Sequence, residues 1–336
     1  MTARFLFSAN YLKVCYNKPY KTKTEDIMDY SQILSQQFNI KEEYAKNIIT
    51  LLDDGNTIPF IARYRKEMHG SMDDQLIREF AEKLEYLRGL DKRRDEIRSL
   101  IDAQEKLTDE INLALDKAAT LSELEDIYRP YRPKRKTRAS IAKEKGLEPL
   151  ANDILKQEKG FDPSKSAVDY IDEEKGVTSV EDAIQGAMDI IAELVSDNAE
   201  IRKRIRNLTN ANGVLVSVAT DEEKDSVYKN YYDYKEPVKK IAGHRVLAVN
   251  RGEKEGFLKV SVETDSEKPL NSIFRAMITD KNQLCSDIIR EACTDAYQRL
   301  IYPSIEREVR NDLTDTASEN AMKVFAVNLK QLLMQP

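Results

Sequence analysis

The feature that most constrains the fold is a stripe of apolar residues between positions 76 and 101. Large apolar residues recur there every three or four positions, with one polar turn between Leu90 and Ile97, and charged residues such as Arg93 and Glu96 lie between them. That spacing places the apolar side chains on one face of an α-helix. The pattern predicts a single helix of about 30 residues that serves as a spine for shorter helices, because no flanking heptads indicate a coiled coil. The stripe consists of Leu76, Phe80, Leu84, Leu87, Leu90, Ile97 and Ile101.

Composition agrees with a mainly helical protein that has a sizeable core. The chain has 336 residues, of which 33% are charged and 41% hydrophobic, with only 11 glycines and 10 prolines. Many charges and few helix breakers are typical of long amphipathic helices, and the length suggests about two domains. The net charge of −6 argues against a protein that coats nucleic acid with its whole surface, but it allows a local basic patch.

Cysteine and histidine are too sparse for a disulfide framework or a zinc site. Cys15, Cys285 and Cys293 are scattered, which favours reduced thiols and the cytoplasm. His69 and His244 lie far apart, so we expect no metal and no cofactor. The longest apolar run, residues 213–219, is far shorter than a membrane span, so we also expect no membrane partner.

Changes in the hydrophobic period divide the chain into five segments. Residues 1–28 are predicted to be a loose tail, 29–72 a small helical module compatible with a helix-turn-helix, and 73–212 a helical domain. Residues 213–270 contain two β-branched runs, 246–249 and 258–262, that predict a short hairpin. Residues 271–336 return to helices. The predicted fold class is mainly α: a multi-subdomain helical array with a long spine helix, an N-terminal helix-turn-helix-like module and a short β hairpin.

Residues 129–138 form the best candidate for a contact with a ligand. Six of these ten residues are basic, and two prolines and Tyr131 lie among them. A proline-stiffened loop presents cations to phosphates with little loss of entropy, and the tyrosine ring can stack on a base. The alternative is that the cations pair with the nearby Glu123, Glu125 and Asp126 and hold helices together. The candidate nucleic-acid-binding residues are Arg129, Arg132, Lys134, Arg135, Lys136 and Arg138, followed by Arg63, Arg65 and Lys66 after a short third helix, and by His244 and Arg245.

No pattern in the sequence predicts a catalytic site. It contains no phosphate-binding glycine loop, no nucleophile elbow and no His-Glu-x-x-His motif. Carboxylates are abundant, but they alternate with lysine and arginine at helical spacing, which is typical of solvated, ion-paired faces. Arg202, Lys203, Arg204 and Arg206 are interpreted in the same way, as a solvated helix face.

Six stretches together resemble the Tex family of bacterial RNA-binding transcription accessory proteins. They are GNTIPFIARYRKE (55–67), LSELEDIYRPYRPKRKTR (121–138), EKGLEPLA (144–151), HRVLAVNRGE (244–253), PSIERE (303–308) and VFAVNL (324–329). The resemblance extends from about residue 29 to residue 336 and leaves residues 1–28 outside. It implies a non-catalytic helical scaffold and nucleic-acid-associated module of a transcription accessory factor. The implied partners are RNA or single-stranded nucleic acid and the transcription machinery.

Members of that family continue into a ribonuclease-H-like YqgF domain, helix-hairpin-helix motifs and a C-terminal OB-fold domain that binds RNA. The resemblance therefore implies the N-terminal half of such a protein, with weak nucleic-acid binding and no nuclease residue to assign. Two other functions stay open from the residues alone. One is a pure protein-interaction scaffold that docks on the transcription machinery, and the other is a helix-turn-helix regulator that binds DNA.

Overall fold

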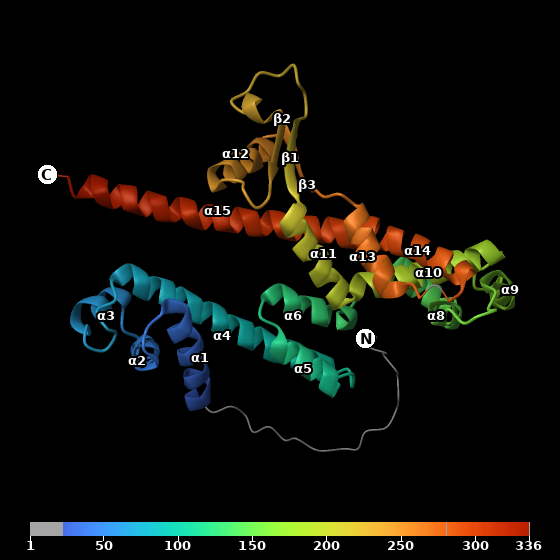
Figure 1. Cartoon of the computed structure of the whole chain (residues 1–336), viewed down its shortest axis with the longest axis horizontal. Coiled ribbons are helices and arrows are strands. Elements are labelled where there is room, and N and C mark those ends of the chain that lie inside the picture. The colour runs from blue at the N-terminus through green and yellow to red at the C-terminus, as the bar shows by residue number, and fades with distance from the viewer. Residues whose placement is uncertain (1–22, 280, 336) are drawn as a thin grey trace. The chain divides into compact units, whose positions relative to one another are not determined.

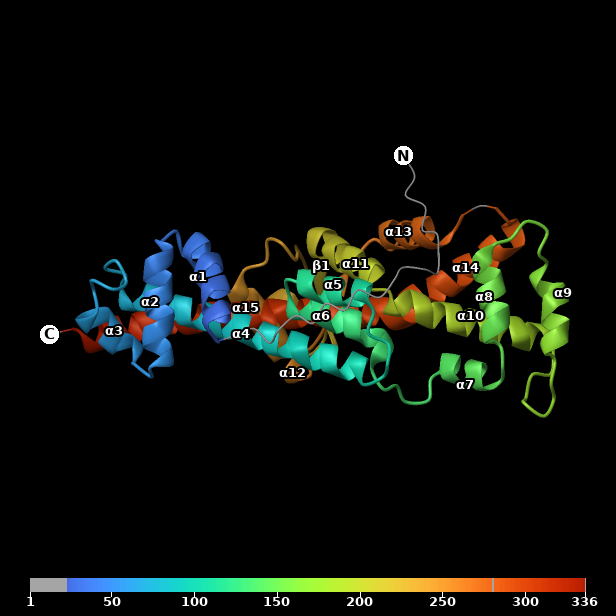
Figure 2. The ribbon, with the colours of Figure 1, turned by 90° about the horizontal axis from the view of Figure 1, so that it is seen from below.

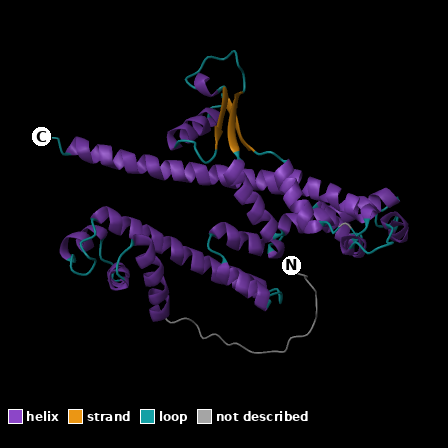
Figure 3. Ribbon diagram, viewed as in Figure 1, coloured by secondary structure: helices purple, strands orange, loops and turns teal. Residues whose placement is uncertain are grey.

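The structure, a computed structural model, describes residues 23–279 and 281–335, and these residues are mainly helical with one small sheet (Figures 1 and 3). This confirms the prediction that the fold is mainly α. The chain divides into two compact units, Met1–Glu96 (unit 1) and Ile97–Pro336 (unit 2). No helix among the described residues is both long and apolar enough to cross a membrane.

Unit 1 is a small helical bundle whose core draws on every one of its described helices. Leu34, Ile49, Ile61 and Phe80 are fully buried in this core, and each comes from a different helix. The Asp73 carboxylate accepts a hydrogen bond from the Leu76 amide at 2.8 Å and so caps the fourth helix. The helices are α1 (Lys23–Phe38), α2 (Glu42–Asp53), α3 (Ile58–Tyr64) and α4 (Asp74–Asp102), of which α4 continues into unit 2.

Helix α4 confirms the predicted spine. It runs without a break from Asp74 to Asp102, and Phe80, Leu84, Leu90 and Ile97 are buried along it. The segment boundaries differ from those expected. Helix α1 already begins at Lys23, inside the predicted tail, while residues 1–22 lie outside the described residues. The division between the units falls within α4 and not at residue 72.

Unit 2 is organised around α10. Ala187, Ile191 and Val195 lie fully buried on this helix, which packs against α7, α8 and α14. The Ser179 hydroxyl accepts a hydrogen bond from the Asp182 amide and fixes the start of α10. The α-helices of unit 2 after α4 are α5 (Asp109–Lys117), α6 (Leu121–Tyr128), α7 (Arg138–Glu144), α8 (Glu148–Lys156), α9 (Pro163–Ala167), α10 (Val180–Asp197), α11 (Ala199–Asn212), α12 (Gly243–Lys254), α13 (Glu267–Met277), α14 (Gln283–Asp295) and α15 (Tyr302–Leu333).

The small sheet of unit 2, drawn in orange in Figure 3, has three antiparallel strands in the order β2-β1-β3. These are β1 (Val214–Ala219), β2 (Asp233–Pro237) and β3 (Leu258–Glu263). The predicted hairpin between residues 246–249 and 258–262 is therefore wrong, because residues 246–249 belong to α12. Val246 and Val249 are three positions apart and both buried, as one face of a helix requires. That helix packs against β3.

Gly252 allows α12 to approach the sheet closely. A Cβ atom at this position would lie 2.5 Å from Cδ1 of Leu258 and 3.1 Å from Cδ1 of Tyr228. We therefore expect Gly252→Ala to destabilise the protein by about 1–3 kcal/mol through overpacking. Gly89→Ala is the control, because no described atom lies within 4 Å of a Cβ added to this exposed position of α4. It should stabilise by about 0.5–1 kcal/mol through helix propensity. Urea denaturation measures the free energy of unfolding of both variants. A change of the same sign in the two variants would contradict this account.

Helix α15 is the longest helix of unit 2 (Figures 1 and 2), and only its first half contains buried residues. A π-helical turn, Ala296–Ile301, leads into it, and Pro303 occupies its first turn, where a missing amide proton costs no hydrogen bond. Its residues Ile305, Val309 and Ala317 are buried, whereas all described residues from 318 onward are exposed.

Candidate nucleic-acid interface

The basic loop, residues 129–138, is held at both ends by local structure. After α6 the chain makes a 3₁₀ turn, Arg129–Tyr131, and the side-chain amide of Gln104 donates to the Tyr131 carbonyl at 2.9 Å. At the other end Thr137 and Ser140 form a reciprocal capping box that starts α7. The loop therefore presents its side chains from a fixed backbone.

The first three cations of the basic loop are engaged with carboxylates. Arg132 pairs with Glu125, and Lys134 pairs with Asp197 and lies 3.4 Å from Glu193. Arg129 lies 3.5 Å from Asp197. The alternative of internal ion pairs therefore holds for this half of the loop, although most of the acids that take part come from α10 and only Glu125 was expected.

Burial also shifts the pKa of two groups in this half of the loop. It lowers the pKa of Arg129, and the positive charge of Arg202 lowers it further. Burial likewise raises the pKa of the Tyr131 hydroxyl. Both shifts mark a packed part of the loop, so we do not expect these side chains to be the ones that reach a ligand.

The second half of the basic loop presents its cations to solvent. Arg135, Lys136 and Arg138 are exposed, and within the described part of the chain no carboxylate pairs with any of them. The structure thus separates the six predicted loop residues into three that hold helices together and three that are available to an anion. Arg135, Lys136 and Arg138 are the stronger candidates for phosphate contacts.

A cavity of about 430 Å³ opens beside the basic loop. Six cationic side chains, including Arg135, Arg138 and Arg299, line it together with the three carboxylates of Asp189, Glu193 and Asp197. Burial raises the pKa of Asp189, whereas the nearby charges of Arg299 and Arg138 oppose that rise. Two of these cations, Arg132 and Arg299, also pair with Glu125 and Asp295, which do not line the cavity. The cavity therefore has a small surplus of positive charge, which suits a phosphate group.

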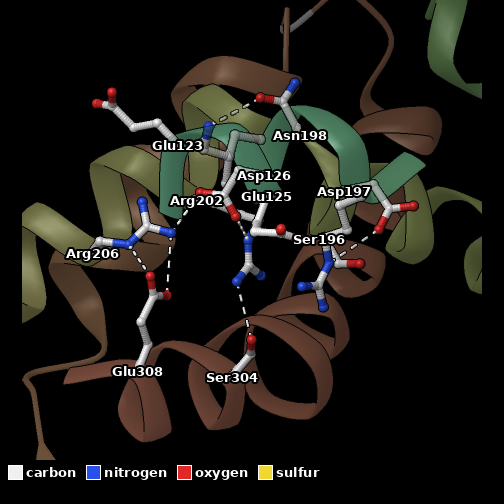
Figure 4. A network of polar contacts seen from close by, with 12 residues as sticks. Glu123, Glu125, Asp126, Ser196, Asp197, Asn198, Arg202, Arg206, Ser304 and Glu308 are labelled. Atoms are coloured by element: carbon white, nitrogen blue, oxygen red, sulfur yellow. Dashed lines mark hydrogen bonds and ion pairs between the residues drawn. The ribbon is translucent and has the colours of Figure 1, made fainter. Parts of the chain in front are cut away.

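Next to the basic loop lies a buried ion network that sequence reasoning missed (Figure 4). Asp126 accepts hydrogen bonds from Arg202 at 2.5 Å and from Arg206 at 2.6 Å. Arg206 also pairs with Glu308 at 2.9 Å, and Arg202 donates to the Ser304 hydroxyl at 3.1 Å. The network joins α6, α11 and α15, so α6, which leads into the loop, is fixed to the rest of unit 2.

The interpretation of Arg202 and Arg206 as a solvated helix face is wrong. They lie four positions apart on the same face of α11, and only 2% of Arg202 and 9% of Arg206 is exposed. Lys203, by contrast, is half exposed and pairs with Glu123 at 2.8 Å. Nη1 of Arg202 has no hydrogen-bond partner among the described atoms, which leaves one buried donor of this network unsatisfied.

The other predicted site residues lie apart from the basic loop. Arg63, Arg65 and Lys66 belong to unit 1, at and just beyond the end of α3, and all three are exposed. His244 and Arg245 begin α12, and neither lines the cavity. His244 is exposed, and Arg245 contacts Glu236 at 2.9 Å and the Tyr234 hydroxyl at 3.3 Å. Their roles in binding stay predictions.

Two family models match the chain. The Tex-like protein N-terminal domain matches residues 28–102, and the Tex central region-like model matches residues 158–325, which is half of the chain. The chain belongs to the Tex family. Helix α3 lies inside the first match, whereas the basic loop lies between the two. The resemblance seen in the sequence is thereby confirmed.

Relatives of this Tex-family chain come from bacteria and from animals. It is 43% identical to the uncharacterized protein YdcI of Bacillus subtilis, over 92% of this chain and 44% of that protein. It is 36% identical to the transcriptional accessory protein Tex of Neisseria gonorrhoeae, over 91% and 41% respectively. It is 31% identical to the human S1 RNA-binding domain-containing protein 1, over 94% and 33%. The chain thus spans less than half the length of these relatives.

Proposed function

We propose that this chain is a non-catalytic helical scaffold and nucleic-acid-associated module of a Tex-like transcription accessory factor. The observation that carries the proposal is the trio of exposed cations, Arg135, Lys136 and Arg138, on a loop whose backbone is fixed at both ends. None of the three forms an ion pair with a carboxylate within the described part of the chain, although Arg138 lies near Asp189, so a phosphate backbone can supply the counter-charge. One relative is named as a transcriptional accessory protein and another as an S1 RNA-binding domain-containing protein, which supports the same role.

A non-catalytic role is proposed because the carboxylates beside the basic loop already have partners. Glu125, Glu193 and Asp197 pair with loop cations, and Asp126 is enclosed by two arginines. Such groups stabilise the loop and its supporting helices, and they are not free to exchange protons with a substrate.

Charge reversal of the three exposed loop cations tests the proposal. The variant Arg135→Glu, Lys136→Glu and Arg138→Glu should bind single-stranded RNA more weakly whatever its sequence. The slope of log affinity against log salt should fall by roughly 2 units, because each lost phosphate contact removes about 0.7. Lys134 is left unchanged, since its loss would break two ion pairs. Fluorescence anisotropy at several salt concentrations measures both quantities, and wild-type affinity should be on the order of the micromolar-or-weaker range of non-specific binding.

A matched control separates a local contact from a change of total charge. Lys235→Glu, Lys239→Glu and Lys240→Glu alter the net charge equally, at exposed positions in β2 and just after it. This control should bind RNA nearly as the wild type does, and the thermal midpoint of both triple variants should stay unchanged. Equal weakening by the two triple variants would show that total charge alone acts, and would overturn the assignment to the loop.

Two alternatives give different outcomes in the same titrations. A pure protein-interaction scaffold, docking on the transcription machinery, predicts no binding to RNA or DNA. A helix-turn-helix regulator predicts tight binding to one duplex sequence. Helix α3 has only seven residues and exposes Phe60 and Tyr64, whereas base edges are read mainly by charged and amide side chains. This composition favours single strands over a duplex.

A further inference from the structure

The surface of α3 in unit 1 carries an aromatic pair that its own core does not use. Ile61 is the residue of α3 that is fully buried. Phe60 and Tyr64 are four positions apart and therefore share another face of the helix. Tyr64 is 66% exposed and Phe60 is 36% exposed. Large aromatic side chains usually bury most of their apolar surface in a core or an interface. The exposure of these two rings therefore suggests that this face of α3 contacts a ligand.

The pair is held in a fixed arrangement. The two ring centroids lie 5.4 Å apart with an interplanar angle of 41°. The guanidinium of Arg65 lies 5.7 Å from the centroid of the Phe60 ring. Phe60 therefore positions both the Tyr64 ring and the Arg65 charge, and Tyr64 is the ring with more area free for a ligand.

Positive charge surrounds this pair. Arg63, Arg65 and Lys66 are exposed, and within the described residues no carboxylate forms an ion pair with any of them. The acid that follows directly in sequence is Glu67. An exposed aromatic ring beside several unpaired cations is the combination that single-strand-binding proteins use, because bases stack on the ring and phosphates meet the cations.

We propose that Tyr64 stacks on a base of single-stranded nucleic acid and that Arg63, Arg65 and Lys66 hold the flanking phosphates, with Phe60 as a positioning residue. The proposal rests on the nucleic-acid role proposed above and names its ligand class, but it does not depend on the basic loop. An acidic peptide would use the cations alone and would leave the exposed ring without a function. The ring's exposure is therefore what favours a nucleic acid.

Substitutions of Tyr64 in the full chain test the stacking contact. Against a short fluorescein-labelled oligouridine, Tyr64→Ala should bind roughly five-fold or more weakly, the usual effect of removing one stacked ring. Tyr64→Phe keeps the ring and should bind as the wild type does. The matched control is Tyr86→Ala, which removes a 43% exposed ring from the same unit; Lys83 already lies 4.7 Å from the centroid of this ring, and Glu82 and Glu85 lie close by in the sequence. It should leave affinity unchanged.

A tryptophan reporter observes the stacking directly. The chain contains no tryptophan, so Tyr64→Trp introduces a single indole at the proposed site. Oligouridine should quench its fluorescence in a saturable way that weakens as salt is added. Tyr86→Trp should show no saturable quenching. Polyglutamate of similar charge should leave the indole at position 64 unquenched, and equal quenching by it would identify an acidic-peptide site and overturn the proposal.

The outcomes also separate this proposal from the proposed function. Suppose first that the wild type binds oligouridine. If the loop reversal weakens this binding but Tyr64→Ala does not, then the α3 site is wrong and the loop assignment stands. If Tyr64→Ala and the loop reversal each weaken binding, both sites contribute. If Tyr64→Ala alone weakens binding, the α3 site stands and the loop assignment is wrong. A wild-type chain that binds no oligouridine would refute both.

Discussion

Replacing Asp126 with alanine is expected to lower the free energy of unfolding by about 3–5 kcal/mol. The substitution removes the carboxylate that accepts hydrogen bonds from Arg202 and Arg206. Arg202 would then stay buried with only the Ser304 hydroxyl as a partner. A buried charge without a counter-charge is one of the few causes of so large a loss. Urea denaturation followed by far-UV circular dichroism measures the change.

Lys203→Ala is the matched control for the loss of Asp126. Lys203 lies on the same helix as the two buried arginines and also forms an ion pair, but its side chain is half exposed. Exposed pairs contribute roughly 0–1 kcal/mol, so this variant should unfold at nearly the same urea concentration as the wild type. If Asp126→Ala were equally mild, the buried network would not be what fixes α6 to α11 and α15.

Phe80→Ala should destabilise unit 1 by about 3–5 kcal/mol, because it leaves a large cavity in a small core. Phe80 is fully buried, and its ring centroid lies 5.3 Å from that of Phe38. The remaining side chains come from four helices that the fold holds in place, so they can fill the space only in part. Hydrogen exchange followed by mass spectrometry should show faster exchange of the amides in α1, α2 and α3.

The control for this cavity is Tyr86→Ala, which truncates an aromatic side chain of the same helix at an exposed position. A surface substitution of this kind should change the free energy of unfolding by about 0.5 kcal/mol or less. Unchanged exchange in unit 1 after Phe80→Ala would mean that Phe80 does not anchor this core.

The parts of the fold that follow from local spacing could be predicted from the sequence. Helix α4 was predictable because its apolar residues repeat over about seven turns, which is far more than chance produces. A run of four apolar residues carries much less information, and 246–249 suits a strand or a helix equally well. In the structure this run belongs to a helix that approaches the sheet closely at Gly252, and such a contact between separate elements does not appear in the local spacing.

The candidate site shows the same division between local and distant information. Composition alone pointed to residues 129–138, but it gave no reason to separate Lys134 from Arg135. Their difference comes from Glu193 and Asp197, which lie about sixty positions further along the chain. Arg202 and Arg206 were misread for the same reason, because the buried Asp126 that neutralises them is 76 positions from Arg202.

Helix α15 has a mechanical consequence for unit 2. The exposed part of this helix, from residue 318 to Leu333, is about 24 Å long at 1.5 Å per residue. If the helix rotated by 10° about its partly buried first half, its far end would move by roughly 4 Å. Ser304 and Glu308, which contact the buried arginines, lie in that half. The helix therefore has the geometry of a lever, because a displacement of its far end would turn the part that contacts the ion network, and that network also holds α6, which leads into the basic loop.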